Sequence, residues 1–323
     1  MNPDNRYAVL TGGIGGAKLA LGLSRIVPAD RLTAIVNTGD DFEHFGLPIS
    51  PDVDTLMYTL AGEVDDTTGW GRREETWHCM DALEALGGET WFRLGDRDIA
   101  THARRRQLLH EGQRLTEATA ELCRRFGVAQ RVLPMSDDAV PTRVITDAGS
   151  MDFQHYFVRD RAEPRVRHVE YHGAERARPS PEILGALREP GLAGIVIAPS
   201  NPWLSIDPIL AIPAMRAAIR DAGVPVVAVS PIVGATAIKG PTAKIMGELG
   251  LEVSAGSVAA HYGELLDGFI IDDTDRDAAD DIRAGGLVVE TSQTVMQSLD
   301  DRIRVAESVL ELIESISRNR ETA

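Results

Sequence analysis

Residues 11–27 read TGGIGGAKLALGLSRIV, and this stretch decides how the first part of the chain is expected to fold. It follows a short apolar run at residues 7–10, and its apolar residues between 18 and 26 suit the buried face of a helix. The pattern predicts a strand, a glycine turn and a helix. The apolar run LTAIV at residues 32–36 then completes a βαβ unit of the parallel kind, whose ligands bind at the carboxyl ends of the strands.

The same alternation of strands and helices returns in the second half of the chain. The runs GIVIAPSNP at residues 194–202 and VPVVAVSP at 224–231 both end in small polar residues, and GFIIDD follows at 268–273. Residues 51–127 carry helical patterns instead, and residues 131–160 alternate apolar and polar side chains as β-hairpins do. These two stretches interrupt the parallel pattern.

We therefore predict an α/β fold with a doubly wound, mostly parallel, Rossmann-like sheet and a mixed helical and β-hairpin insertion. The chain shows no repeat and no linker-like stretch, so a single domain is expected over residues 1–323. Its core is predicted at residues 1–60 and 185–323, where the loops suit a nucleotide, and its insertion at residues 61–184.

The composition favours a small-molecule ligand. Lys and Arg number 33 against 49 Asp and Glu, and the resulting net charge of −16 disfavours nucleic acid and anionic membranes as main partners. Cys79 and Cys123 cannot build a disulfide framework, and no metal-type cysteine spacing occurs. The first residues lack a signal-peptide pattern, and no apolar run is long enough for a membrane span, so we expect a cytoplasmic protein.

The glycine loop matches neither of two known phosphate-binding templates. A dinucleotide fingerprint starting at Gly13 needs a glycine where Lys18 stands, and a P-loop starting at Gly12 needs a hydroxyl residue where Leu19 stands. Glycines before a helix still leave backbone N–H groups open to an anion. A tight turn that packs the strand on the helix explains the same residues equally well.

Four carboxylates are predicted to crowd one edge of the sheet. Asp40 and Asp41 follow the second strand, and Asp52 and Asp54 follow in SPDVDT. Asp52 after Ser50 is also typical of a helix start, where acidic residues stabilise the first turn without any ligand. Asp54 is harder to explain in that way, and repeated oxygen ligands near a phosphate site suit Mg²⁺ on a diphosphate.

Three further loops carry polar residues at the predicted ligand edge. LGDRDIATH places Arg97 at a helix start, where it suits a phosphate, although a surface salt bridge is the simpler reading and His102 is expected to be structural. APSNP and SPIVG, with Lys239 and Lys244 behind them, suit a nucleotide, although such loops are also ordinary turns. The chain shows no Ser-His-Asp order and no nucleophilic cysteine, which leaves transfer chemistry driven by a metal and by positioning.

The motifs taken together resemble the 2-phospho-L-lactate transferase family, CofD and its actinobacterial relatives. The resemblance runs from about residue 7 to residue 275, and SPDVDT together with LGDRDxATH is its most specific part. The matching stretches, in chain order, are GGIGGAKL, VNTGDD, ISPDVDTLMYTLAG, GWGRREETWH, WFRLGDRDIATH, LPMSDD, IAPSNPWLSIDPILAIP, VAVSPIVG and KGPTAKIM.

The resemblance implies a step in making the deazaflavin coenzyme F420. A guanosine diphosphate-linked donor gives 2-phospho-L-lactate or phosphoenolpyruvate to the ribityl hydroxyl of the deazaflavin Fo, and GMP leaves. Position by position, Asp54 and Arg97 match residues that contact Fo, Asp54 is the catalytic candidate, and the insertion contributes to the deazaflavin pocket. The resemblance also implies Mg²⁺ held by Asp41, Asp52 and Asp54, and a homodimer. The implied nucleotide-binding residues are Gly12, Gly13, Gly15, Gly16, Lys18, Ser200, Asn201, Ser230 and Gly234.

Two other functions stay open from the sequence. Gluconeogenesis-factor proteins share the glycine loop and an early acidic pair but bind nucleotide sugars in a regulatory role, and SPDVDT with LGDRDIATH argues against them. A nicotinamide oxidoreductase is weaker, because Lys18 breaks the fingerprint and no acid closes the second strand. The sequence does not decide among phospholactate, phosphoenolpyruvate and 3-phosphoglycerate as the acid that the donor carries.

Overall fold

The main sheet of the computed structural model is parallel throughout, and the model describes residues 4–238 and 240–322. Within these residues the sheet has seven strands, with the first strand of the chain near its middle. The order is β14 (Val288–Ser292), β13 (Gly268–Asp272), β10 (Val226–Val229), β9 (Leu192–Ile197), β1 (Arg6–Thr11), β2 (Leu32–Val36) and β5 (Arg131–Pro134). The predicted α/β fold with a Rossmann-like parallel sheet is confirmed.

Helices cover both faces of this sheet, as the doubly wound prediction requires. Alternate strand residues point to opposite faces: Ala8 and Leu10 of β1 join one core, and Tyr7 and Val9 join the other. The core with Val9 is covered by α1 (Gly13–Ile26), α2 (Pro51–Ala61), α4 (Asp96–His110), α5 (Leu115–Arg125) and α12 (Leu299–Thr322). The core with Leu10 is covered by α6 (Pro181–Ala186), α7 (Asp207–Leu210), α8 (Pro213–Asp221), α9 (Thr242–Glu248), α10 (Ala255–Tyr262) and α11 (Ala279–Ala284).

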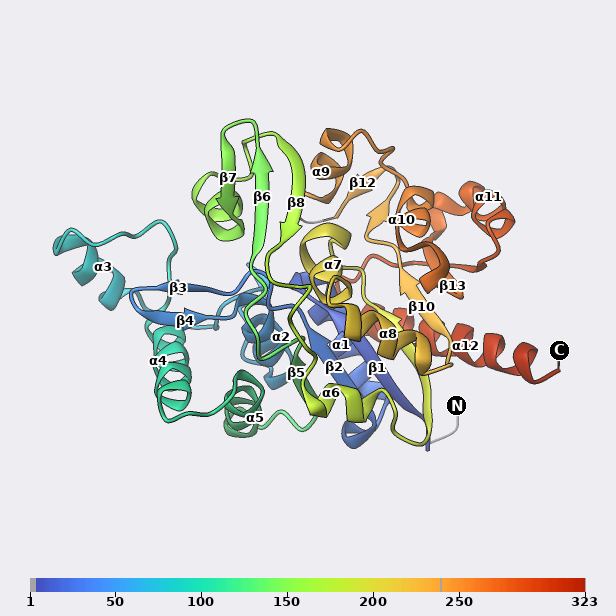
Figure 1. Ribbon diagram of the computed structural model, residues 1–323, viewed down its shortest axis with the longest axis horizontal. Coiled ribbons are helices and arrows are strands. Elements are labelled where there is room, and N and C mark those ends of the chain that lie inside the picture. The colour runs from blue at the N-terminus through green and yellow to red at the C-terminus, as the bar shows by residue number, and fades with distance from the viewer. Residues whose placement is uncertain (1–3, 239, 323) are drawn as a thin grey trace.

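The remaining elements extend this core. Two short strands, β3 (Phe42–His44) and β4 (Leu47–Ile49), form a hairpin, which lies with α3 (His78–Ala85) at the end of the molecule away from α12 (Figure 1). An antiparallel sheet holds β7 (Gly149–Asp152), β6 (Thr142–Thr146) and β8 (Val166–Tyr171) in that order, and β11 (Ile232–Val233) pairs with β12 (Thr236–Ala237). No helix in residues 4–238 and 240–322 has both the length and the apolar character of a membrane span.

One predicted hairpin segment belongs to the main sheet instead. Residues 131–134 form β5, which pairs in parallel with β2 and closes one edge of the sheet. Its residues Val132 and Leu133 are buried, so this strand has two covered faces rather than one. The hairpin prediction holds only for β6 and β7, which pair antiparallel around Gly149.

The helix α1 packs closely on α12 as well as on its own strand. A Cβ atom on Gly22 would lie 2.1 Å from the carbonyl oxygen of Arg302, so only glycine allows the two helices to approach this closely. One turn earlier in α1, Lys18 donates a hydrogen bond of 2.8 Å to the carbonyl of Met296, just before α12. Both contacts fix the glycine loop relative to the end of the chain.

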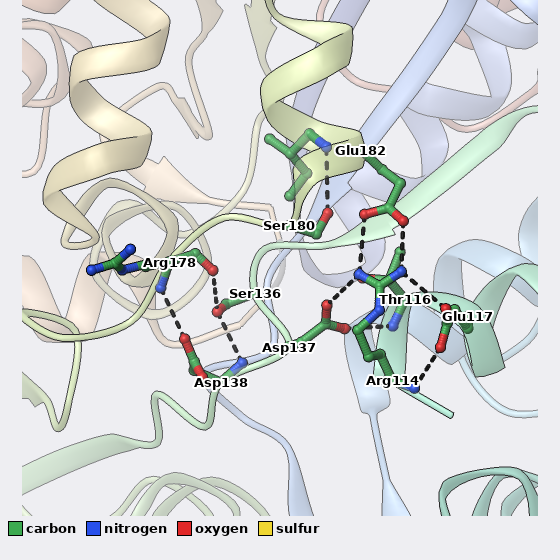
Figure 2. Close-up of polar contacts among 10 residues, drawn as sticks. Arg114, Thr116, Glu117, Ser136, Asp137, Asp138, Arg178, Ser180 and Glu182 are labelled. Carbon is green, nitrogen blue, oxygen red and sulfur yellow. Dashed lines mark hydrogen bonds and ion pairs between the residues drawn. The ribbon is translucent and has the colours of Figure 1, made fainter. Parts of the chain in front are cut away.

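The segment after β5 is held by a cluster of charged contacts as well as by the packing of Met135 and Val140 in the core. Arg114 contacts Glu182 at 2.7 Å, Asp137 at 3.0 Å and Glu117 at 3.1 Å, as Figure 2 shows. Asp137 also accepts a hydrogen bond of 2.8 Å from the backbone of Thr116. The guanidinium therefore joins α5, the loop after β5 and α6 at one point.

The two neighbours of Asp137 join the same loop to the chain before α6. Ser136 is fully buried and its hydroxyl donates to the carbonyl of Arg178 at 2.6 Å, while Asp138 accepts from the backbone N–H of Arg178 at 3.0 Å (Figure 2). The motif LPMSDD thus makes structural contacts, and its residues do not line the cavity described below.

Candidate active site

A cavity of about 330 Å³ lies at the carboxyl edge of the main sheet. Its lining includes residues from the loops that follow three neighbouring strands: Gly12 after β1, Ser200 after β9 and Ser230 after β10. The strand order reverses beside β1, because β2 lies on one side of it and β9 on the other. Ligands of open parallel sheets bind at such a reversal, so this cavity is the candidate active site.

The glycine loop is shaped by close packing. A Cβ atom on Gly15 would lie 2.4 Å from the carbonyl oxygen of Pro199, and one on Gly16 would lie 2.2 Å from the hydroxyl of Thr11. Gly13 has a φ of 64°, in the region that favours glycine. The tight turn therefore accounts for this loop, and the close approach of its backbone to a ligand stays a prediction.

The first amide of α1 is capped by the protein itself. The backbone N–H of Gly13 donates to Asp52 at 2.6 Å, and the other carboxylate oxygen of Asp52 accepts from Asn37 at 2.9 Å. Lys18 lines the cavity but its ammonium bonds the Met296 carbonyl. The positive end of this helix thus faces a carboxylate of the same chain. Asp52 therefore stabilises the start of α1 as well as the first turn of α2, to which it belongs.

The capping carboxylate of Asp52 and those of Asp40 and Asp41 form an acidic cluster. Burial, together with the charges of Asp52 and Asp41, raises the pKa of Asp40 well above its usual range. Burial likewise raises the pKa of Asp41 well above its usual range, against a hydrogen bond from Ser50. Burial raises the pKa of Asp52 to about 6, although Asn37 and Gly13 donate to it. The cluster is short of positive charge.

Asp54 has a different environment. Its carboxylate faces Arg105, whose Nη1 donates to Oδ2 at 3.0 Å while Nη2 contacts Oδ1. Asp54 lines the cavity, whereas Arg105 is fully buried behind the wall. One wall residue is therefore an acid that an arginine holds by both oxygens.

A chain of polar contacts extends from Asp54 and Arg105 to further side chains of α2 and α4. Arg105 Nη1 also lies 3.1 Å from Nδ1 of His102, and Nε2 of His102 lies 3.3 Å from Asp98. Asp98 accepts a hydrogen bond of 2.6 Å from the hydroxyl of Tyr58. Burial alone would raise the pKa of Asp98, but His102, Tyr58 and the charge of Arg105 lower it below its usual value. His102 thus links Arg105 to Asp98, and it also lines the cavity, which the structural role expected from the sequence did not include.

Arg97 and Arg93 lie differently with respect to the cavity. Arg97 does not line it, and its guanidinium is near Glu74 and the carbonyl of Arg73, which is the surface ion pair that the simpler reading predicts. Arg93, four residues earlier, lines the cavity and lies 4.5 Å from the ring centroid of Trp77. The cation of this segment that lines the cavity is therefore Arg93.

Aromatic rings from residues 61–184 form another part of the lining. Phe153 and Phe157 stack with ring centroids 5.4 Å apart and ring planes 10° apart. Trp70 and Phe92 line the cavity as well, and Trp70 is 47% exposed. Flat, accessible rings beside a polar edge are the surface that a planar aromatic ligand needs.

Most of the residues predicted from the sequence meet in this cavity. Those that line it are Gly12, Gly13, Gly15, Lys18, Asp52, Asp54, Ser200, Asn201 and Ser230. Gly16, Asp41, Arg97 and Gly234 lie outside the lining. Gly234 donates its N–H to Asp275, Lys244 pairs with Glu248, and Lys239 lies outside the described residues.

Two groups were missed by the sequence reasoning. Arg105 follows Asp98 and His102 at helical spacing, four and then three residues apart, so all three side chains share one face of α4. That spacing could have predicted three charged or titratable side chains on the buried face of this helix. Arg93 and the aromatic lining gave no comparable signal, because they come together only through the fold.

The fold and the cavity define an α/β protein that binds its ligand where the strand order of a parallel sheet reverses. A structure of a UPF0052 family protein from Bacillus halodurans matches with a TM-score of 0.62 at 17% identity, over 95% of this chain and 98% of that one, which shows the shared fold. The family model for 2-phospho-L-lactate transferase CofD matches residues 8–310. The chain belongs to this transferase family, and the prediction that it is an enzyme is confirmed.

Named relatives are similar over nearly the whole chain. The phosphoenolpyruvate transferase of Streptomyces coelicolor is 44% identical over 317 residues, which cover 96% of this chain and 99% of the relative. The 2-phospho-L-lactate transferase of Methanosarcina mazei is 38% identical over 303 residues, which cover 94% and 99%. The names of these relatives differ in the acid that is transferred.

Proposed function

We propose that this protein transfers a phosphorylated three-carbon acid, phosphoenolpyruvate or 2-phospho-L-lactate, from a guanosine diphosphate-linked donor to the ribityl hydroxyl of Fo. The observation that carries the proposal is one cavity that joins the glycine loop and buried acids of the sheet edge to a lining of accessible aromatic rings. A nucleotide-linked donor suits the first part, and a planar deazaflavin suits the second.

The donor occupies the edge formed by the loops after β1, β9 and β10. Small residues such as Gly12, Ser200 and Ser230 leave room for a ribose and a diphosphate there. Fo lies against Trp70 and Phe157, with Arg93 near its polar edge. In this arrangement the ribityl chain of Fo reaches Asp54.

The reaction exchanges one phosphorus–oxygen bond for another. The ribityl oxygen attacks the phosphorus that carries the three-carbon acid, and the bond from this phosphorus to the bridging oxygen breaks, so GMP leaves with that oxygen. Asp54 accepts the hydrogen bond of the attacking hydroxyl and orients it, and the proton is lost during the attack rather than before it, since an alkoxide is a far stronger base than a carboxylate. Positioning supplies most of the rate in such transfers.

Mg²⁺ is proposed as the metal, held by Asp52 together with Asp40. Both carboxylates line the cavity, the pKa of each is raised by burial, and Asp41 behind them has a buried oxygen without a hydrogen-bond partner. Among residues 4–238 and 240–322 no three acidic, histidine or cysteine side chains already converge as a complete metal site, and Mg²⁺ on a diphosphate needs only one or two carboxylates. When bound, the ion neutralises charge on the diphosphate.

An assay of transfer tests the proposal. The protein is incubated with Fo, Mg²⁺ and the phosphoenolpyruvyl or phospholactyl guanosine donor, and the product is weighed by mass spectrometry while GMP release is followed. We expect GMP and a deazaflavin phosphodiester in equal amounts, and the mass of the product identifies the acid. A protein that binds a nucleotide sugar but neither quenches the fluorescence of Fo nor releases GMP would be the regulatory alternative.

A matched pair of tryptophan variants tests the place of Fo. Trp70→Ala removes a ring of the cavity lining, and we expect the Kd for Fo to rise about 10-fold, as for the loss of one stacking partner. Trp91→Ala is the control, because Trp91 belongs to the same segment but does not line the cavity. Equal Kd values for the two variants would contradict the placement. The homodimer remains a prediction that sedimentation can check.

A further inference from the structure

We infer that Arg105 is a positioning residue, whose guanidinium fork fixes the angle at which Asp54 faces the acceptor hydroxyl. The inference rests on the proposed function, because it explains how Asp54, the cavity residue proposed to contact Fo, is held in its orientation. Arg105 itself does not line the cavity, so it acts on the acceptor only through Asp54.

The fork holds the carboxylate at both oxygens. Nη1 of Arg105 donates to one oxygen at 3.0 Å and Nη2 contacts the other, so the plane of the Asp54 carboxylate follows the plane of the guanidinium. Each carboxylate oxygen has a second lone pair, which leaves Asp54 able to accept from a hydroxyl in the cavity. A single point charge in place of Arg105 would neutralise Asp54 without fixing its plane.

The guanidinium is itself held in place by several partners. Nη1 also donates to the carbonyl of Pro48 at 3.3 Å and lies 3.1 Å from Nδ1 of His102. On the far side of His102 lies Asp98, whose carboxylate accepts a hydrogen bond from the hydroxyl of Tyr58 and whose backbone N–H donates to Glu75 at 2.8 Å. The fork therefore has one orientation rather than several.

This geometry distinguishes an orienting role from a role in charge balance alone. Asp54 is one of four acids at this edge, and a cation of any shape opposite it would offset its charge. The structure supplies instead a fully buried arginine with its fork aligned to one carboxylate. Arg105→Lys keeps the charge and removes the fork, so it separates the two roles.

The test is a double-mutant cycle between Arg105→Lys and Asp54→Asn, with kcat, KM for the donor and Kd for Fo measured on folded, purified protein. We expect Arg105→Lys to lower kcat about 10- to 100-fold, as a small misplacement of a reacting group does, with Kd and KM within about twofold of wild type. In the Asp54→Asn background the same change should lower kcat no further. Arg106→Lys is the control, because Arg106 is exposed on the same helix and pairs with Glu43 on the surface.

Each outcome decides between the roles. A cooperatively melting Arg105→Lys protein with the kcat of wild type overturns the inference, as does an undiminished effect in the Asp54→Asn background. If Arg105→Lys does not fold, Arg105→Gln is put through the same cycle: a lower kcat at unchanged Kd for Fo that disappears in the Asp54→Asn background supports the inference, and a wild-type kcat overturns it. Failure of the proposed function is a separate result, since the wild-type protein would then release no GMP with Fo.

Discussion

The most unusual residues of this protein are the buried acids beside the glycine loop. Asp40, Asp41 and Asp52 lie close together, and burial raises the pKa of each of them. For Asp52 the rise from 3.8 to about 6 corresponds to a penalty on the order of 3 kcal/mol when the carboxylate is charged. A penalty of this kind is typical of a site whose charge is completed by a ligand.

The acids make stability depend on pH in a defined direction. Between about pH 4 and pH 6 Asp52 holds a proton in the folded state that it has lost in the unfolded chain, so Asp52 stabilises the folded state at low pH and this contribution is lost as pH rises through 6. The raised pKa values of Asp40 and Asp41 act in the same direction. Other acids of the protein titrate in the same pH range. The difference in the free energy of unfolding between a variant of the cluster and the wild type isolates the contribution of the cluster. We expect metal-free Asp40→Asn to gain stability over wild type at pH 7 but not at pH 4, measured by urea unfolding.

The same variant reports on magnesium. Millimolar Mg²⁺ should raise the melting temperature of the wild-type protein at pH 7, because the ion binds the folded state, and should raise that of Asp40→Asn less. Asp281→Asn, an exposed acid on α11, serves as the control and should behave as wild type. An equal Mg²⁺ response in all three proteins would remove Asp40 from the proposed metal site.

At the residue scale the sequence predicted which acidic residues belong to the site better than it predicted which residues they contact. The four acids were identified because they follow a strand end and a helix start, which are local features. The pairing of Asp54 with Arg105 spans 51 positions and exists only once α2 and α4 pack together. Arg97, taken from a local motif, proved to be on the outside for the same reason.

At the scale of elements, the close approach of α1 and α12 depends on a single missing side chain. Gly22→Ala would bring a methyl group to 2.1 Å from a backbone carbonyl that cannot rotate away, so we expect a loss of about 1–3 kcal/mol in the free energy of unfolding. Gly247→Ala is the matched control in α9, where a Cβ atom meets nothing within 4 Å, and it should stabilise by about 0.5–1 kcal/mol. Equal effects would show that helix propensity, not packing, governs Gly22.

The loop after β5 offers a second prediction about elements. Ser136→Ala leaves the carbonyl of Arg178 and the N–H of Asp138 without their buried partner, and we expect a loss of about 1–3 kcal/mol, measured by urea unfolding. Activity per folded molecule should be unchanged, because this residue does not line the cavity. Ser150→Ala, at an exposed position of strand β7, should change stability by less than about 0.5 kcal/mol.

The strands show why the fold was predictable in part. β1, β2, β9 and β10 are continuous apolar runs that end in polar loops, and such runs are buried on both faces in parallel sheets. β5 has the same buried character over only four residues. It joins the main sheet by pairing with β2, which lies about 100 residues earlier in the chain, so no local pattern could indicate this pairing. Short strands of this kind are assigned by tertiary contacts.

At the scale of the whole molecule, net charge opposes the proposed substrates. The chain carries a charge of −16, and the donor is itself an anion, so the two repel each other over the distance that salt leaves unscreened. Raising the ionic strength from about 0.01 to 0.15 M shortens that distance from about 30 to 8 Å.

This repulsion predicts how the enzyme responds to salt. At a fixed concentration of free Mg²⁺, kcat/KM for the donor should increase a few-fold over this range of ionic strength, whereas kcat at saturation should change little. The measurement is a series of initial rates in KCl. A decrease in kcat/KM with salt would mean that Lys18 and Arg93, which line the cavity, outweigh the net charge in attracting the donor.

The carboxylate that caps α1 also bears on which molecules inhibit the enzyme. Inorganic phosphate and simple phosphate esters normally settle on a free helix N-terminus, but here the amide of Gly13 is occupied by Asp52 and the next charge they meet is negative. With Asp52 at this position, an anion is expected to approach this end of α1 more readily when a cation accompanies it. The cap should therefore weaken the binding of small phosphates at this site. Metal-chelated diphosphates are expected to compete with the donor instead.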